Sequence, residues 1–102
     1  MNTHLTDLVT VIRSKNAGPT LLTIDLFFRG PADFAQAIAS EALRADAVAR
    51  LYGLGDGEVR RFDLPSLQAM KFTLPRRVCA GSPGDGDVYG AQQHGPLLGV
   101  RL

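Results

Sequence analysis

The sequence is poor in the residues that mark several common classes of small protein. Its 102 residues include one cysteine, Cys79, which allows neither an internal disulfide nor a cysteine-based zinc site. An excess of charge of one sign is also lacking, because eleven Lys and Arg residues against ten Asp and Glu leave a net charge of +1. That balance removes the usual electrostatic argument for a nucleic-acid partner.

Long apolar runs are missing as well. No stretch approaches the ~20 apolar residues that a membrane helix needs. The N-terminus, Met1 to His4, has no basic segment ahead of an apolar stretch, as a secretory signal would. We find no repeat and no linker, and six of the eleven glycines lie between residues 81 and 99. We therefore expect one cytoplasmic domain over residues 1–102, with no membrane partner and a loop-rich last quarter.

Alternation of apolar and polar residues predicts strands in two parts of the chain. Between Thr20 and Arg29 the alternate positions are apolar, and the same pattern marks Leu67–Leu74. We predict further strands at Glu58–Leu64 and Leu97–Leu102, with Pro65 in a connection. Leu5–Arg13 stays open: its β-branched residues favour a strand, while apolar residues at i, i+3, i+4 and i+7 favour a helix. The short pattern and the turn-forming residues after it incline us to the strand.

The spacing of apolar residues changes to steps of three and four between Pro31 and Tyr52, which predicts helix. Asp46 is predicted as an N-cap inside this stretch and Gly53 as its C-terminal stop, so we expect two short helices or one bent helix. Strands on both sides of a helical stretch predict an α+β two-layer sandwich, with a mainly antiparallel sheet and helices on one face. The predicted core is Leu22, Ile24, Leu26, Phe28, Phe34, Ile38, Val48, Met70, Phe72 and Leu74.

Three segments, Ile12–Gly18, Leu22–Asp25 and Gly84–His94, resemble a family of domains of unknown function. That family is similar to the small ferredoxin-fold domain of AtuA-type proteins, named for acyclic terpene utilisation. Arg13–Gly18 takes the place of the Arg-Ser-Gly-Asp-Lys-Gly segment of the AtuA type, and Arg61–Pro65 resembles its Arg-Tyr-Glu-Leu-Pro run. The resemblance implies a ferredoxin-like sheet and a context of carboxylic-acid or acyl-CoA catabolism, and it carries over no reaction.

Four consecutive polar residues, Arg13, Ser14, Lys15 and Asn16, are predicted to form a turn after the first strand. An arginine fork and a lysine point charge can together hold a carboxylate or a phosphate, so we consider this turn an anion-binding site. A solvated turn shaped by Asn16 and a following glycine is the alternative. Further candidate anion-binding residues are Arg76, Gln92 and Gln93.

The glycine-rich segment after residue 80 contains the other candidate residues. Asp85 and Asp87 begin a calcium-like loop, but Tyr89 and Pro96 stand where ligands belong, so we predict no metal and keep the two aspartates as weak candidates. His94 is the candidate catalytic residue, because an imidazole titrates near neutral pH; a structural role is the alternative. No cofactor motif is present.

Two functions follow from these features. The first is an accessory or interaction domain that self-associates or works with an AtuA-like partner, since Leu21, Phe27 and Ala69 leave apolar surface on the second face of the sheet. The alternative is a small lyase, hydratase or isomerase with an anionic substrate. In either case we expect the Arg13–Asn16 turn and the Gly84–His94 loop to form one anion-accepting cleft; a structural ion pair of Arg13 or Lys15 with Asp85 or Asp87 is the competing expectation.

Overall fold

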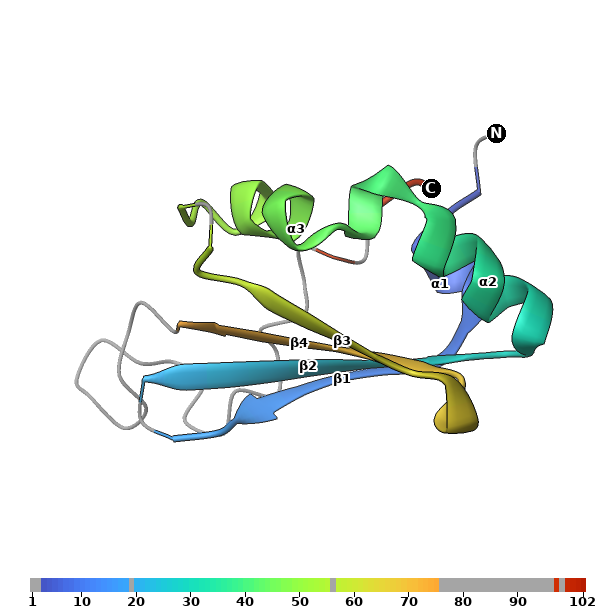
Figure 1. The fold of residues 1–102 in the computed structure, drawn as a ribbon, viewed down its shortest axis with the longest axis horizontal. Helices are drawn as coiled ribbons and strands as arrows, with labels where there is room; N and C mark the ends of the chain where they lie inside the picture. Colours follow the sequence, from blue (N-terminus) through green and yellow to red (C-terminus); the bar gives the residue numbers. More distant parts are fainter. Residues whose placement is uncertain (1–2, 19, 56, 76–96, 98) are drawn as a thin grey trace.

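A four-stranded antiparallel sheet with helices over one face forms the protein, as the computed structural model shows (Figure 1). The structure describes residues 3–18, 20–55, 57–75, 97 and 99–102. The strands are β1 (Val9–Asn16), β2 (Leu21–Phe28), β3 (Arg60–Leu64) and β4 (Ala69–Pro75), in the order β1-β2-β4-β3. The predicted α+β fold is therefore confirmed. A ferredoxin-like arrangement stays a prediction, because 76–96 lie outside the described residues.

The two central strands owe their place to one-sided apolar patterns. β2 and β4 pair so that Ile24 lies opposite Phe72 and Leu26 opposite Met70, and all four side chains are fully buried. These residues face the helical layer, because successive strand residues point to opposite sides of a sheet. The β3–β4 connection is the short 3-10 helix η2 (Pro65–Leu67), which confirms Pro65 in a connection.

The helical stretch is divided, as predicted, into α2 (Pro31–Ala39), the 3-10 turn η1 (Glu41–Leu43) and α3 (Ala45–Leu51). Gly53 follows the last helix with a φ of 69°, which is the left-handed conformation typical of a glycine stop. Asp46 as an N-cap is wrong. Arg44 occupies the N-cap position in an extended conformation, and the Asp46 carboxylate instead accepts a hydrogen bond from the Ala47 N–H at 2.9 Å.

Leu5–Arg13, whose sequence pattern allowed either a strand or a helix, contains both. A single helical turn, α1 (Leu5–Leu8), precedes β1, which begins at Val9. The helical spacing places Leu5 and Leu8 of the turn α1 in the core, and the β-branched residues that follow form the start of β1. The predicted last strand is wrong for the residues described there: Arg101 forms only an isolated bridge to His4.

The core lies between the sheet and the helices. All the predicted core residues are buried except Ile38, which is 38% exposed. α2 contacts the core through Phe34 and Ala37, three residues apart, and this leaves Ile38 turned toward solvent. Leu43 of η1 is fully buried and was not predicted, since a three-residue turn is too short to show a period.

Candidate functional site

The face of the sheet turned away from the helices, here called the outer face, is not covered by any described helix (Figure 1). Alternation from the buried core positions defines its members. On β1 and β2 they are Val11, Arg13, Lys15, Leu21, Thr23, Asp25 and Phe27. On β3 and β4 they are Arg60, Phe62, Leu64, Ala69, Lys71 and Thr73.

The predicted turn at Arg13–Asn16 is wrong, because these residues form the last half of β1. Arg13 and Lys15 lie on the outer face, whereas Ser14 and Asn16 lie opposite Ile24 and Leu22 on the core face. Ser14 is 6% exposed. The four side chains are therefore divided between the two faces of the sheet, with Arg13 and Lys15 together on the outer face. Anion binding by Arg13, Ser14, Lys15 and Asn16 stays a prediction.

Arg13 is held on the outer face by two neighbours on β2. Its Nε lies 3.3 Å from an Asp25 carboxylate oxygen, and its guanidinium lies 5.0 Å from the centre of the Phe27 ring. Asp25 could not be predicted as the counter-charge, because the pair depends on the register that places the two residues opposite each other. The arginine side chain is 59% exposed, so the ion pair contributes at most about 1 kcal/mol.

The other predicted site residues lie outside the described part of the chain: Arg76, Asp85, Asp87, Gln92, Gln93 and His94. The predicted cleft between residues 13–16 and 84–94, and His94 as a catalytic residue, therefore stay predictions. Within the described residues, no group of three or more His, Cys, Asp or Glu side chains could hold a metal ion. Of the described helices, none is long and apolar enough to cross a membrane.

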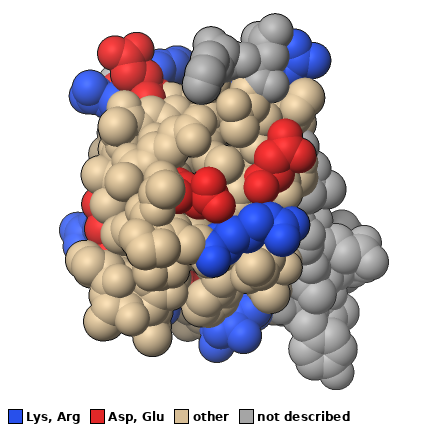
Figure 2. All heavy atoms as spheres, turned by 90° about the vertical axis from the view of Figure 1, so that its right-hand side faces the viewer, with Lys and Arg blue, Asp and Glu red and all other residues tan. Residues whose placement is uncertain are grey.

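Exposed apolar side chains lie on three of the four strands. Val11 is 46% exposed, Leu21 49%, Phe62 45% and Leu64 37%. The prediction was wrong for Ala69, which lies opposite Phe27 and Leu64 and is only 2% exposed. At the end of the sheet where β3 meets β4, the described surface is mostly uncharged (Figure 2). Three of these four apolar side chains lie on the edge strands β1 and β3, and the fourth, Leu21, lies at the start of the central strand β2.

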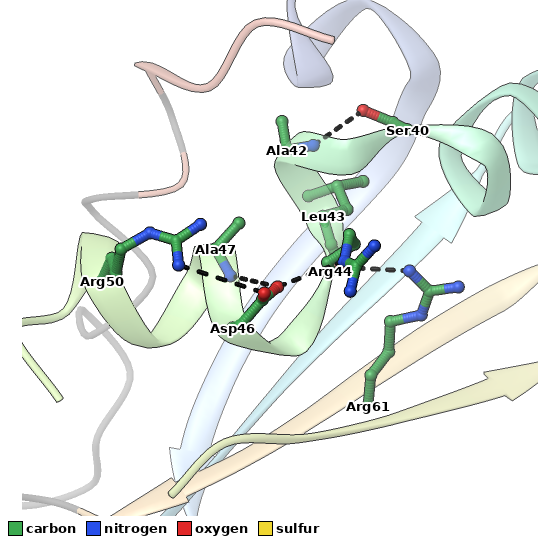
Figure 3. Close-up of polar contacts among 8 residues, drawn as sticks. All are labelled: Ser40, Ala42, Leu43, Arg44, Asp46, Ala47, Arg50 and Arg61. Atoms are coloured by element: carbon green, nitrogen blue, oxygen red, sulfur yellow. Dashed lines mark hydrogen bonds and ion pairs between the residues drawn. The ribbon is translucent and has the colours of Figure 1, made fainter. Parts of the chain in front are cut away.

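A hollow of about 530 Å³ lies where the start of α3 faces β3. Arg44, Ala45, Asp46, Gly57, Val59 and Arg61 line it. Its charged groups are engaged with one another (Figure 3): Arg44 Nε lies 3.3 Å from Asp46 Oδ1, and Arg50 lies 4.0 Å from the same carboxylate. Arg61 reaches from β3 to donate to the Leu43 carbonyl of η1 at 3.1 Å. This network ties β3 to the helical layer and offers no paired nucleophile and base.

Asp46 provides a pH-dependent contribution to stability. Desolvation acts to raise its pKa, but the Ala47 hydrogen bond and the Arg44 charge outweigh it, so the pKa lies below the usual 3.8. A lowered carboxyl pKa stabilises the folded state above pH 3.8, and this stabilisation disappears as the pH falls through the folded-state pKa. Wild type should therefore be more stable than Asp46→Asn near neutral pH, and urea unfolding should show the difference closing in acid. A difference that stays constant with pH would contradict the assignment.

The described residues define a small α+β domain whose antiparallel sheet presents apolar and basic side chains on the face that the helices leave open. The chain belongs to the family described as domain of unknown function DUF4387, whose family model matches residues 5–101. No curated protein and no solved structure matches the chain.

Proposed function

We propose that this chain is an accessory interaction domain that associates through its sheet, either with a second copy or with an AtuA-like protein of carboxylic-acid or acyl-CoA catabolism. The observation that carries the proposal is the exposed apolar surface on the strands: Val11, Leu21, Phe62 and Leu64. Covering such side chains contributes about 25 cal/mol for each Å² removed from water. Apolar side chains exposed in this way can be covered by a protein partner.

Small-molecule binding has less support among the described residues. Ligand sites are concave and mostly apolar, with a few convergent polar groups. The hollow beside α3 is lined by arginines already bonded to Asp46, to Asp63 and to the Leu43 carbonyl. On the outer face, Arg13 is held against Asp25 and Phe27. A partner with an extended surface fits this arrangement better than a small anion does.

The test compares exposed apolar residues on the two layers. Val11→Ser and Leu64→Ser alter the sheet, while Ile38→Ser and Leu51→Ser alter helix positions that are 38% and 43% exposed. We expect the wild-type chain to associate with itself at tens of micromolar in light scattering, or to co-purify with a co-expressed AtuA-like protein. At least one sheet variant should weaken that association several-fold, and the helix variants should retain it. A monomeric chain that also ignores the AtuA-like protein would refute the proposal.

A further inference from the structure

β3 is an edge strand with an accessible backbone. In the order β1-β2-β4-β3, the described strands give it one neighbour only, β4. Four of its five residues are exposed, and Arg61 is partly buried. The strand contains no proline, so each residue whose backbone N–H and C=O point away from β4 can both donate and accept a hydrogen bond. An edge of this kind can accept a further strand.

The sequence of β3 complements itself when two copies run antiparallel. With Phe62 opposite Phe62 of a second copy, Arg61 lies opposite Asp63 of that copy, and Asp63 lies opposite the second copy's Arg61. Within each chain Arg61 already contacts Asp63, with Nε 2.9 Å from Oδ1, so the pairing joins two such ion pairs into one group of alternating charges. Arg60 then lies opposite Leu64, where the arginine stem can cover the leucine side chain. Opposite charges and aromatic pairs facing across antiparallel strands each stabilise the pairing by about 0.2–1 kcal/mol.

We propose that two copies of this chain pair along β3, about a two-fold axis at Phe62, to form one continuous antiparallel sheet with both helical layers on the same side. This rests on the proposed function and specifies its partner and its surface. A two-fold axis requires the same patch on both copies, and β3 meets that requirement within five residues.

Other pairings fit less well. Moving the axis by one residue places Arg61 opposite Arg61 or Asp63 opposite Asp63, which brings like charges together. The other edge strand, β1, carries only cations, Arg13 and Lys15, so no register of β1 with itself forms an ion pair. The charge pattern therefore selects both the strand and the register.

A disulfide tests the register directly. Residues directly opposite in antiparallel strands have Cα atoms about 4.5–5.5 Å apart, within the 4.4–6.8 Å range of disulfides. In a Cys79→Ser background, Phe62→Cys should form a disulfide-linked dimer on mild oxidation. Leu64→Cys is the matched control: in this register its two copies lie about 13 Å apart along the strands, so it should stay monomeric on a denaturing gel. Mixing Leu64→Cys with Arg60→Cys should restore the link.

A charge reversal provides a second test that needs no cysteine. Asp63→Lys places a cation opposite Arg61 of the other copy, and it also removes the carboxylate that Arg61 contacts within its own chain. It should abolish the dimer in light scattering. Asp33→Lys makes the same change of charge on α2 and should leave the dimer intact. Circular dichroism of each variant separates a lost interface from a lost fold.

The outcomes separate this inference from the proposed function. If the chain dimerises but Phe62→Cys links no better than Leu64→Cys, or Asp63→Lys still dimerises, the β3 pairing is wrong and the interaction domain stands. If the chain is monomeric but binds an AtuA-like protein, the pairing is likewise wrong. If it binds neither itself nor that protein, both proposals fail.

Discussion

Phe72→Ala should lower the free energy of unfolding by about 3–5 kcal/mol, the usual loss for truncating a buried phenylalanine. Among the described residues Phe72 is the largest side chain that is fully buried, and it lies in the middle of β4 between Ile24 of β2 and Arg61 of β3. Its removal leaves a cavity that the surrounding strands cannot fill without breaking their register. Because the free energy of unfolding of a small domain is only about 5–15 kcal/mol, this one substitution removes a large share of the stability.

The matched control is Phe62→Ala on the neighbouring strand. The substitution is chemically the same, but the Phe62 side chain is 45% exposed on the outer face. Urea unfolding should be measured at a protein concentration too low for the chain to associate. The loss of unfolding free energy should then be well under half of that for Phe72→Ala. Equal losses for the two variants would mean that the outer face carries a second core, and the assignment of the two faces would be wrong.

The elements with a strong period could be predicted from the sequence. β2 and β4 lie at the centre of the sheet, so one face of each is apolar without interruption, and the alternation is visible in Leu22–Phe28 and Met70–Leu74. The division of the helix was predicted from Asp46 as an internal N-cap, but the helical layer breaks earlier, between Ala39 and Ala45, and Arg44 occupies the N-cap position. α1 is followed directly by β1, and the apolar residues of the two elements form one continuous pattern. The boundary between them therefore could not be predicted from the sequence.

The candidate site depended on information that the sequence does not carry locally. Arg13–Asn16 was predicted as a turn because it is polar, yet Ser14 is buried opposite Ile24 and the strand continues to Asn16. Strand register pairs Arg13 with Asp25, and strand order makes β3 an edge. Both are long-range properties of the sheet. The charges of β3 that complement those of a second copy are visible in its five residues. They can form a pairing surface only because β3 lies at the edge of the sheet.

Arg61→Met should lower the free energy of unfolding by about 1–3 kcal/mol, through lost hydrogen bonds rather than lost packing. The Arg61 guanidinium contacts both carboxylate oxygens of Asp63, with Nε at 2.9 Å and Nη2 at 3.0 Å. Its remaining nitrogen, Nη1, donates to the Leu43 carbonyl at 3.1 Å. Methionine keeps most of the stem but leaves this carbonyl without its side-chain donor and Asp63 without its cation, while the Arg61 side chain is only 17% exposed.

Two further variants distinguish the geometry from the charge. Arg61→Lys restores the charge but lacks the planar fork that contacts a carboxylate and a carbonyl at once, so it should recover only part of the loss. Arg60→Met removes a cation from the adjacent, exposed position of β3 and should change stability by no more than about 0.5 kcal/mol. If Arg61→Lys matched wild type in urea unfolding, charge alone would hold β3 to η1. If Arg60→Met cost as much as Arg61→Met, the contact with Leu43 would have no special role in joining the sheet to the helical layer.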